Sequence, residues 1–245
     1  MSAAAPVHLT PSAGWYSTMK PTVEAVAGIG LLVIALPLMG VAWLLIRLTS
    51  RGPGFYTQTR AGWRNQAYTI VKIRSMYHTP EVARNTDWAK LTGDARVTPV
   101  GRVLRALHLD ELPQLFNVIR GEMSLVGPRP ERPEVIARKQ LIDLVPGYAH
   151  RTTMRPGVTG LAQVQLPADT DVTSVRHKVY YDLYYLAHQS LWLDARICAA
   201  TVLKSFLSPD RLRRLLFLPT RERVCAHFLR LLTPPEPVPN PGTAG

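Results

Sequence analysis

The sequence is poor in acidic residues and nearly free of cysteine. It contains 17 Asp and Glu against 29 Lys and Arg, which gives a formal net charge of +12. This excess favours an anionic partner, which can be nucleic acid, an anionic membrane surface or a phosphate-rich substrate. The two cysteines, Cys198 and Cys225, form no CxxC motif and have no histidine at metal-binding spacing. We therefore interpret them as buried thiols in a reducing compartment rather than as a disulfide or a zinc site.

Nucleotide-binding loop motifs are also missing. The sequence contains neither a GxxxxGKS/T loop nor a GxGxxG loop, so P-loop and Rossmann folds have no support. Hydrophobic residues make up 47% of the 245 residues, which is enough for a packed core and argues against global disorder. The length fits one domain, alone or with an anchor.

A long apolar run lies near the beginning of the sequence. Residues 23–46 read VEAVAGIGLLVIALPLMGVAWLLI, with Glu24 near the start. About 20 apolar residues are needed to cross a bilayer as a helix, and the run reaches that length. A secretory signal is disfavoured, because the run is long for one and no small-residue cleavage site follows it before Arg47. A buried helix of a soluble protein is the alternative to a membrane anchor.

Pro37 interrupts this run. A proline in a helix interior removes one backbone hydrogen bond and clashes with the preceding turn, so we expect a kink near residues 35–36. The kinked helix can cross the bilayer, or it can turn back so that both ends lie on one face. Basic residues flank both ends, which suits a re-entrant hairpin on the cytoplasmic face, but the charges alone leave both outcomes open.

Composition divides the chain into five segments. They are a loose leader at 1–20, a membrane anchor at 21–50, a core domain at 51–206, a basic amphipathic segment at 207–232 and a disordered Pro-rich tail at 233–245. The basic segment combines arginines with leucines and is split by Pro219, which is typical of helices lying on an anionic membrane. A solvated charged face on a soluble helix is the alternative.

The core domain begins with a small β element. Residues 55–59 and 68–73 are rich in aromatic and β-branched side chains and predict a β-hairpin or two irregular strands. The stretch from 78 to 98 is polar and predicts a loop with a helical turn.

Helices follow in the second half of the core. Leu112, Leu115, Phe116 and Ile119 fall on one helical face, and Gly121 marks the end of that helix. Further helices are expected at 133–144, 173–188 and 192–206. The helix at 173–188 carries an aromatic stripe that is either core packing or an interfacial aromatic belt, made of Tyr181, Tyr184, Tyr185 and His188. The predicted fold is α+β and mostly helical.

Asp110 and Glu111 open the first of these helices. A carboxylate there lies in the positive potential of the helix N-terminus, so we expect Asp110 to be ionised and available. Neighbouring helix residues point in different directions, so one acid can attack while the other holds a metal or manages protons. The structural alternative is that Asp110 only caps the helix and Glu111 is an ordinary first-turn acid.

Several cations surround the acidic pair in the sequence. They are Lys72, Arg74, Arg102, Arg105, Arg129 and Arg155. Arg129 lies between two prolines, and a guanidinium on such a stiff loop is well placed to bind phosphate with two hydrogen bonds. Two acids among rigidly held cations indicate Mg²⁺-assisted chemistry on phosphates.

Four strings carry a family resemblance. They are VKIRSM at 71–76, RALHLDELPQLFNVIRGEMSLVGPRPE at 105–131, MRPGVTGLAQV at 154–164 and YYDLYYLAHQSLWLDARI at 180–197. In this order, from about residue 20 to 205, the chain resembles the bacterial sugar transferases, which are polyprenyl-phosphate phosphoglycosyl transferases. With no large multi-span region ahead of the core, it is similar to the small monotopic type.

The resemblance implies a function and a mechanism. It implies a UDP-sugar donor, an undecaprenyl phosphate acceptor, Mg²⁺, and a phosphosugar held covalently on Asp110, with Glu111 near the metal. Lys72, Arg105 and Arg129 would contact phosphates, and we assign Arg74 and Arg155 to phosphate binding as well. The product would start exopolysaccharide, O-antigen, capsule or glycan assembly.

The resemblance also places the enzyme at a membrane. The family's anchor is a re-entrant helix broken at a proline, which favours the hairpin at Pro37. We therefore expect contact with membrane lipid at the bacterial inner membrane, with the core on its cytoplasmic face. A homo-oligomer is left open.

One segment departs from the family pattern. Residues 165–171 read QLPADTD where many relatives have a short Asn-Gly-Arg segment, so this stretch could contribute to donor recognition and leaves the sugar undefined. A non-catalytic basic adaptor at the membrane is the alternative function. Nucleic-acid binding is not expected, because no basic recognition helix or aromatic platform stands out.

Overall fold

The computed structural model describes residues 14–78 and 94–232, and over these ranges the chain is mostly helical with two small sheets. The α-helices are α1 (Trp15–Thr49), α3 (Pro99–Ala106), α4 (Leu115–Ile119), α5 (Pro133–Arg138), α6 (Leu141–Leu144), α7 (Leu161–Gln165), α8 (Val172–His188), α9 (Leu191–Leu203), α10 (Pro209–Leu215) and α11 (Arg221–Leu232). The 3₁₀ helices are η1 (Trp63–Asn65), η2 (Leu109–Gln114) and η3 (Tyr148–Thr153); the strands are β1 (Phe55–Ala61), β2 (Ala67–Ile73), β3 (Ser124–Val126) and β4 (Gly157–Thr159). The predicted α+β, mostly helical class is confirmed.

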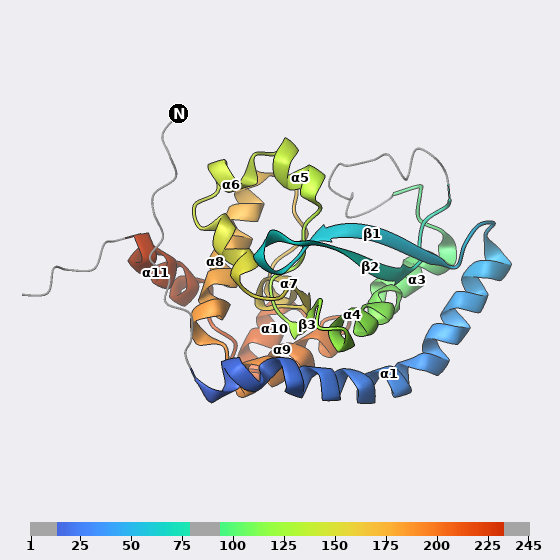
Figure 1. Cartoon of the computed structure of the whole chain (residues 1–245), viewed down its shortest axis with the longest axis horizontal. Helices are drawn as coiled ribbons and strands as arrows, with labels where there is room; N and C mark the ends of the chain where they lie inside the picture. Colours follow the sequence, from blue (N-terminus) through green and yellow to red (C-terminus); the bar gives the residue numbers. More distant parts are fainter. Residues whose placement is uncertain (1–13, 79–93, 233–245) are drawn as a thin grey trace, which may run out of the picture.

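Helix α1 packs against the core along its whole length. Its buried residues form one stripe at spacings of three, four or seven, namely Tyr16, Lys20, Glu24, Gly28, Ala35, Met39, Ala42 and Ile46. Figure 1 shows the helix running beneath the core and rising at one end. The helix begins at Trp15, inside the expected leader 1–20, and residues 1–13 of that leader lie outside the described residues.

The opposite face of α1 is apolar and exposed. Val26, Val33, Ile34, Val41 and Leu48 are each more than half exposed. Within the described parts of the chain, α1 is the one helix long and apolar enough to cross a membrane. Its exposed apolar face therefore has the composition of a lipid-facing surface.

Pro37 lies inside α1 without ending it. The helix runs unbroken from Trp15 to Thr49 through both Pro21 and Pro37. It changes direction along its length (Figure 1), as expected for a helix that contains proline. The chain does not fold back on itself inside α1, so the hairpin form of the prediction is not seen.

A buried polar cluster fixes α1 to the core. Lys20 Nζ donates to Glu24 Oε1 at 2.8 Å, to Tyr185 Oη at 3.0 Å and to the Asp194 carboxylate. The Glu24 carboxylate in turn accepts from the Ser124 hydroxyl and from the backbone N–H of Val126. The cluster therefore joins α1 to α8, α9 and β3.

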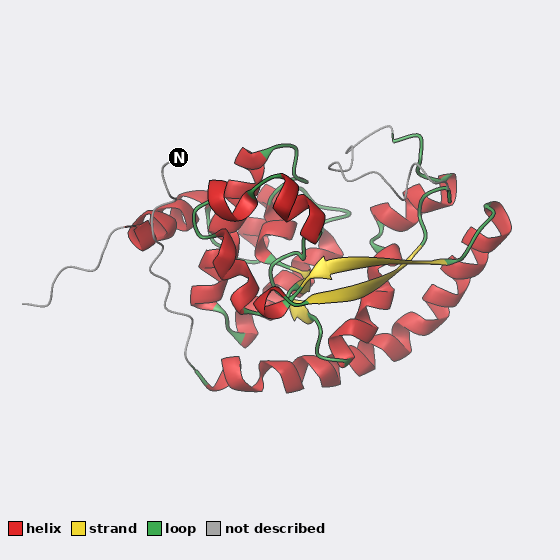
Figure 2. Cartoon of the chain, turned by 45° about the horizontal axis from the view of Figure 1, so that its top comes forward, coloured by secondary structure: helices red, strands yellow, loops and turns green. Residues whose placement is uncertain are grey.

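The predicted β-hairpin is confirmed and is longer than expected. Strands β1 and β2 pair antiparallel from Phe55 opposite Ile73 to Ala61 opposite Ala67. The hairpin crosses the middle of the molecule with helices on both sides (Figure 2). Residues 79–93 of the expected polar loop lie outside the described residues.

Two predicted helices differ from expectation. The first begins as the 3₁₀ helix η2 and becomes α-helical only at Leu115, which changes its buried face: Phe116 is exposed and Asn117 is buried. The one expected at 133–144 is split into α5 and α6, because Gln140 takes the left-handed conformation at φ 48°.

The last two helices of the predicted core are confirmed as α8 and α9. Tyr181, Tyr184 and Tyr185 are all buried, and His188 stacks on Tyr184 with ring centroids 4.1 Å apart. The aromatic stripe is therefore core packing. Cys198 and Cys225 are free thiols of intermediate burial, and burial raises the pKa of Cys198 to about 11.

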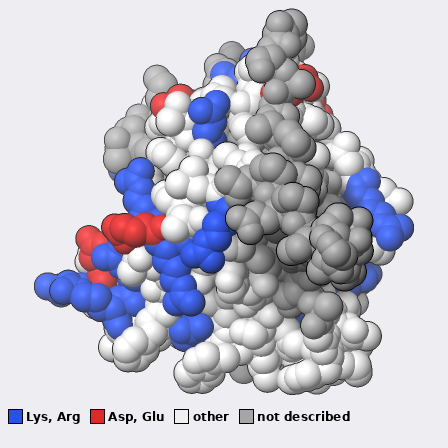
Figure 3. Space-filling view, turned by 90° about the vertical axis from the view of Figure 1, so that its left-hand side faces the viewer, with Lys and Arg blue, Asp and Glu red and all other residues white. Residues whose placement is uncertain are grey.

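The basic segment after the core forms α10 and α11, separated around Pro219 as expected. The apolar side of α11 faces inward, where Val224 is buried and Phe228 stacks on Tyr180 at 3.8 Å. Arg211, Arg214, Arg221 and Arg223 are exposed, and Figure 3 shows basic side chains gathered on this end of the molecule. The outward face of α11, which carries the exposed arginines and the exposed Leu229, is therefore the one free to meet a membrane surface. The expected tail at 233–245 lies outside the described residues.

Candidate active site

The acidic pair lies in η2, which begins directly after a tight turn. His108 occupies the turn in the left-handed conformation, at φ 55°, and precedes the first 3₁₀ residue, Leu109. Asp110 and Glu111 follow in the first turn, so the predicted helix start is confirmed, but His108 and not Asp110 holds the cap position. The two carboxylates have very different surroundings.

Glu111 is held between two cations. Lys72 Nζ lies 2.6 Å from Glu111 Oε1, and Arg129 Nη2 lies 2.8 Å from the same oxygen. A weaker contact of 3.5 Å joins Arg129 Nη1 to Glu111 Oε2. Burial alone would raise the pKa of Glu111, but the charges of Arg129 and Lys72 outweigh it and hold that pKa well below its usual range. Glu111 is therefore an anion at neutral pH.

Asp110 is buried without a partner. Asp110 is only 7% exposed. Within residues 14–78 and 94–232, its carboxylate makes no hydrogen bond or ion pair. Burial raises the pKa of Asp110, and the neighbouring Glu111 charge raises it further. Both effects favour the protonated form and so oppose the expected influence of the helix N-terminus, which would keep this acid ionised. Asp110 is therefore an under-solvated, more basic carboxylate.

The loop that carries Arg129 is fixed by close backbone packing. Strands β3 and β4 pair in parallel, and beyond them the Gly127 N–H donates to the Thr159 carbonyl and the Gly157 N–H to the Pro128 carbonyl, both at 2.9 Å. A Cβ on Gly157 would lie 2.1 Å from the Gly127 nitrogen, so only glycine fits there. Arg129 thus extends from a rigid loop, as the flanking prolines predict.

Arg105 is the one further predicted phosphate ligand that faces the acids. Its charge acts on Asp110 by lowering the pKa of that carboxyl, against the larger effect of burial. No hydrogen bond or ion pair to another described residue engages its guanidinium. Arg105 is therefore free to meet an anion near Asp110.

Arg74 and Arg155 lie elsewhere. The Arg74 guanidinium donates to the Ser50 and Arg51 carbonyls and to the Ser50 hydroxyl, so it holds the end of α1. Arg155 stacks on Trp63, with its guanidinium carbon 5.6 Å from the ring centroid. The structure does not bring Arg74 to the acidic pair, because its Nη atoms bond the chain directly after α1, and Arg155 does not line the pocket beside Glu111.

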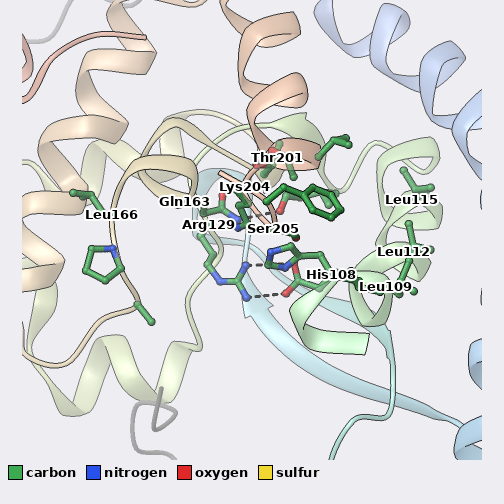
Figure 4. Close-up of a pocket in the computed structure, with 18 of the residues that line it drawn as sticks. His108, Leu109, Leu112, Leu115, Arg129, Gln163, Leu166, Thr201, Lys204 and Ser205 are labelled. Carbon is green, nitrogen blue, oxygen red and sulfur yellow. Dashed lines mark hydrogen bonds and ion pairs between the residues drawn. The ribbon is translucent and has the colours of Figure 1, made fainter. Parts of the chain in front are cut away.

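A pocket of about 740 Å³ opens beside the acidic pair. Glu111, Arg129, His108 and Lys204 line it. Figure 4 shows Arg129, His108 and Lys204 between Leu166 on one side and Leu109, Leu112 and Leu115 on the other. His108 and Lys204 are functional candidates that the sequence analysis missed. A single lysine after an apolar helix looks like an ordinary helix C-terminus, so the sequence carries no signal for its position.

The residues at the site can accommodate Mg²⁺, which stays a prediction. Magnesium is commonly held by one or two carboxylates together with substrate phosphates. Within the described chain no group of three or more His, Cys, Asp or Glu gathers to bind a metal. Glu111 Oε2 has only the 3.5 Å contact with Arg129, which leaves it able to hold a metal ion together with Asp110 and a donor phosphate.

A carboxylate pair among fixed cations beside a pocket is a site for handling phosphate groups. The bacterial sugar transferase family model matches residues 15–208. The chain therefore belongs to the bacterial sugar transferase family, and the predicted resemblance is confirmed.

Three relatives illustrate the family. An undecaprenyl-phosphate glucose phosphotransferase of Komagataeibacter xylinus is 39% identical over 203 residues, 81% of this chain and 38% of the relative. A UDP-N-acetylgalactosamine-undecaprenyl-phosphate N-acetylgalactosaminephosphotransferase of Aeromonas hydrophila is 40% identical over 76% of this chain and 43% of the relative. A UDP-glucose:undecaprenyl-phosphate glucose-1-phosphate transferase of Caulobacter vibrioides is 42% identical over 78% of this chain and 70% of the relative. The chain thus spans about two fifths of the length of the first two relatives.

The different surroundings of the two acids predict opposite stability changes. Asp110→Asn removes a charge that burial disfavours, so it leaves the protein as stable or makes it more stable at pH 7. Glu111→Gln leaves Lys72 and Arg129 without their counter-ion and lowers the free energy of unfolding by on the order of 3 kcal/mol. Thermal unfolding of the detergent-solubilised variants measures both. Equal destabilisation by the two substitutions would contradict the account.

Proposed function

We propose that this chain transfers a sugar phosphate from a UDP-sugar to undecaprenyl phosphate or a similar polyprenyl phosphate, with Asp110 as nucleophile. The observation that carries the proposal is the buried Asp110 carboxylate, unpartnered within the described residues, next to an acid neutralised by two cations. The names of the relatives support the substrate classes. A basic adaptor without catalysis would give no reason to bury an unpaired carboxylate, which costs stability.

The reaction proceeds in two displacements at one phosphorus. An Asp110 oxygen attacks the phosphorus that bears the sugar, the phosphoanhydride bond to the other phosphate breaks, and UMP leaves. A phosphate oxygen of the polyprenyl phosphate then attacks the same phosphorus, the bond to Asp110 breaks, and the carboxylate is regenerated. The product is a polyprenyl-diphosphate sugar, which would start the assembly of a polysaccharide or another glycan. Covalent catalysis of this kind lets one site serve both transfers.

The surrounding charges make the approach of two anions feasible. Arg129 is fixed on its loop beside the pocket, and Arg105 has no ion-pair partner among the described residues, so both can bind the donor pyrophosphate. The raised pKa of Asp110 makes its carboxylate a stronger nucleophile once ionised. Bound Mg²⁺ would add neutralisation of the pyrophosphate. Glu111 keeps Lys72 and Arg129 in place and offers Oε2 to the metal.

The end of the pocket near α7 is the proposed position of the donor sugar. Leu166, Pro167 and Ala168 line this end, and they belong to the segment 165–171 that departs from the family pattern. Lys178 Nζ pairs with Asp169 Oδ2 at 2.7 Å and so holds the segment against α8. Because the named sugars of the relatives differ, this segment is the proposed determinant of sugar choice.

We further propose that the protein is monotopic at the inner membrane, with its core on the cytoplasmic face. Helix α1 is 35 residues long, or about 52 Å, which exceeds the roughly 30 Å of a bilayer's hydrocarbon core. A helix that crossed the bilayer would have to leave the core, whereas the buried stripe of α1 packs on the core from Tyr16 to Ile46. This packing supports a monotopic position, with the exposed apolar face of α1 in lipid and its other face on the core.

Activity is tested with a panel of UDP-sugars and undecaprenyl phosphate in the presence of Mg²⁺. At least one donor should yield UMP and a lipid-linked sugar, and chelation of Mg²⁺ should stop turnover. Asp110→Asn should lower kcat by roughly a thousandfold or more, because the nucleophile is lost.

Asp143→Asn is the matched control, because it makes the same substitution at an exposed acid. Turnover by Asp110→Asn at the rate of the Asp143→Asn control would remove Asp110 from the mechanism. Release of UMP from none of the donors would reject the proposed function itself.

Topology is tested by labelling single cysteines in a variant lacking Cys198 and Cys225. Thr18→Cys and Thr49→Cys place exposed thiols near the two ends of α1. In inverted vesicles, a membrane-impermeant maleimide should label both thiols, because the monotopic arrangement leaves both ends on the cytoplasmic face. Asp143→Cys, at an exposed position of the core, is the control for the cytoplasmic face. Labelling of the two helix ends from opposite sides would show a spanning helix.

A further inference from the structure

The pocket beside the acidic pair has a second, apolar end on the side of α1. Leu109, Leu112 and Leu115 form its wall and pack in one cluster with Ala35 and Met39 of α1. Figure 4 shows these leucines on the side of the pocket away from Leu166. This end of the pocket is therefore separated from the lipid-facing helix only by a layer of apolar side chains.

Exposed apolar side chains also line this pocket. Phe206 is 76% exposed, Val202 is 70% exposed and Leu107 is 46% exposed, and all three line the pocket. Large apolar side chains left in contact with water at a pocket mouth mark a surface that binds an apolar ligand. A nucleotide or a sugar would find few hydrogen-bonding partners here.

Lys204 supplies a positive charge at the inner limit of this apolar end. It follows the last residue of α9 and lines the pocket together with Arg129 and Glu111. Its ammonium group makes no hydrogen bond or ion pair within residues 14–78 and 94–232. Burial lowers the pKa of Lys204, and the charge of Arg129 lowers it further. An anion bound at Lys204 would offset this desolvation.

His108 adds a polar group that lines the pocket together with Lys204. An imidazole N–H can donate a hydrogen bond to a phosphate oxygen. Lys204 supplies positive charge for an anionic head group at this position.

We propose that Lys204 binds the phosphate of the polyprenyl phosphate acceptor, whose first prenyl units lie between Leu107, Val202 and Phe206. The assignment rests on the proposed function and gives the acceptor a separate end of the pocket from the donor sugar. A linear isoprenoid chain with a terminal phosphate has one charge centre and one apolar tail. This shape matches the half-buried ammonium group of Lys204, which lines the same pocket as Leu107, Val202 and Phe206.

The steady-state constants of Lys204→Gln test the assignment. In non-ionic detergent, the KM for undecaprenyl phosphate should rise roughly tenfold or more, because a charge-assisted hydrogen bond to phosphate is lost. The KM for the UDP-sugar should change by less than about twofold, an effect under about 0.4 kcal/mol. Lys204→Arg should keep most of the affinity for the acceptor, which excludes misfolding as the cause. Arg214→Gln removes an equal charge from an exposed position and should leave both constants unchanged.

The apolar end is tested with Phe206→Ser. Phe206 is exposed, so its replacement should not disturb folding. Loss of the apolar contact between Phe206 and the prenyl chain should raise the KM for undecaprenyl phosphate and leave the KM for the UDP-sugar unchanged. Joint dependence on Lys204 and Phe206 would support one ligand that contacts both residues.

Three results would overturn the assignment. A rise confined to the donor KM of Lys204→Gln would place Lys204 in the donor end. A defect that appears only in micelles containing anionic phospholipid would identify Lys204 as a ligand of membrane head groups. An unchanged acceptor KM in Lys204→Gln would exclude any role in acceptor binding. Absence of turnover in the wild-type protein is a different result, because it rejects the proposed function rather than the position of the acceptor.

Discussion

The position of the site depends on the carboxylate of Glu24, a charged side chain within the apolar helix α1. It accepts hydrogen bonds from Ser124 and Val126 on β3, and Lys20 links it to Asp194 on α9. Strand β3 leads directly into the loop that carries Arg129, so the anchor helix and the pyrophosphate-binding loop are joined through one buried group. Buried polar groups of this kind are costly unless every partner is in place, which fixes how α1 meets the core.

The two acids of the pair have different roles because their surroundings differ. Glu111 is paired through Oε1 with Lys72 and Arg129 and contributes order, whereas Asp110 is buried without a partner among the described residues and contributes reactivity. Functional sites often contain such local destabilisation, since a group that reacts with substrate cannot be satisfied beforehand. The surrounding fold supplies the stability that Asp110 does not.

Much of this arrangement could be predicted from the sequence, and the failures have physical causes. The hairpin and α8 follow from residue pattern, and Arg129 follows from its two prolines. The buried face of the 112–119 helix could not, because a 3₁₀ start changes the periodicity and turns Asn117 inward, where it donates to the Thr69 carbonyl and the Glu122 carboxylate. Arg74 and Lys204 were misjudged or missed because the role of a cation depends on partners that are distant in sequence.

The account depends most on a covalent phosphosugar at Asp110. Its most direct test is the intact mass of the protein after incubation with an active UDP-sugar and Mg²⁺ but without any polyprenyl phosphate. The account predicts a mass increase of one sugar phosphate, located on the peptide that contains Asp110 and lost when undecaprenyl phosphate is added. An unmodified protein that releases UMP only when the acceptor is present would contradict it, because the sugar phosphate would then pass directly from donor to lipid.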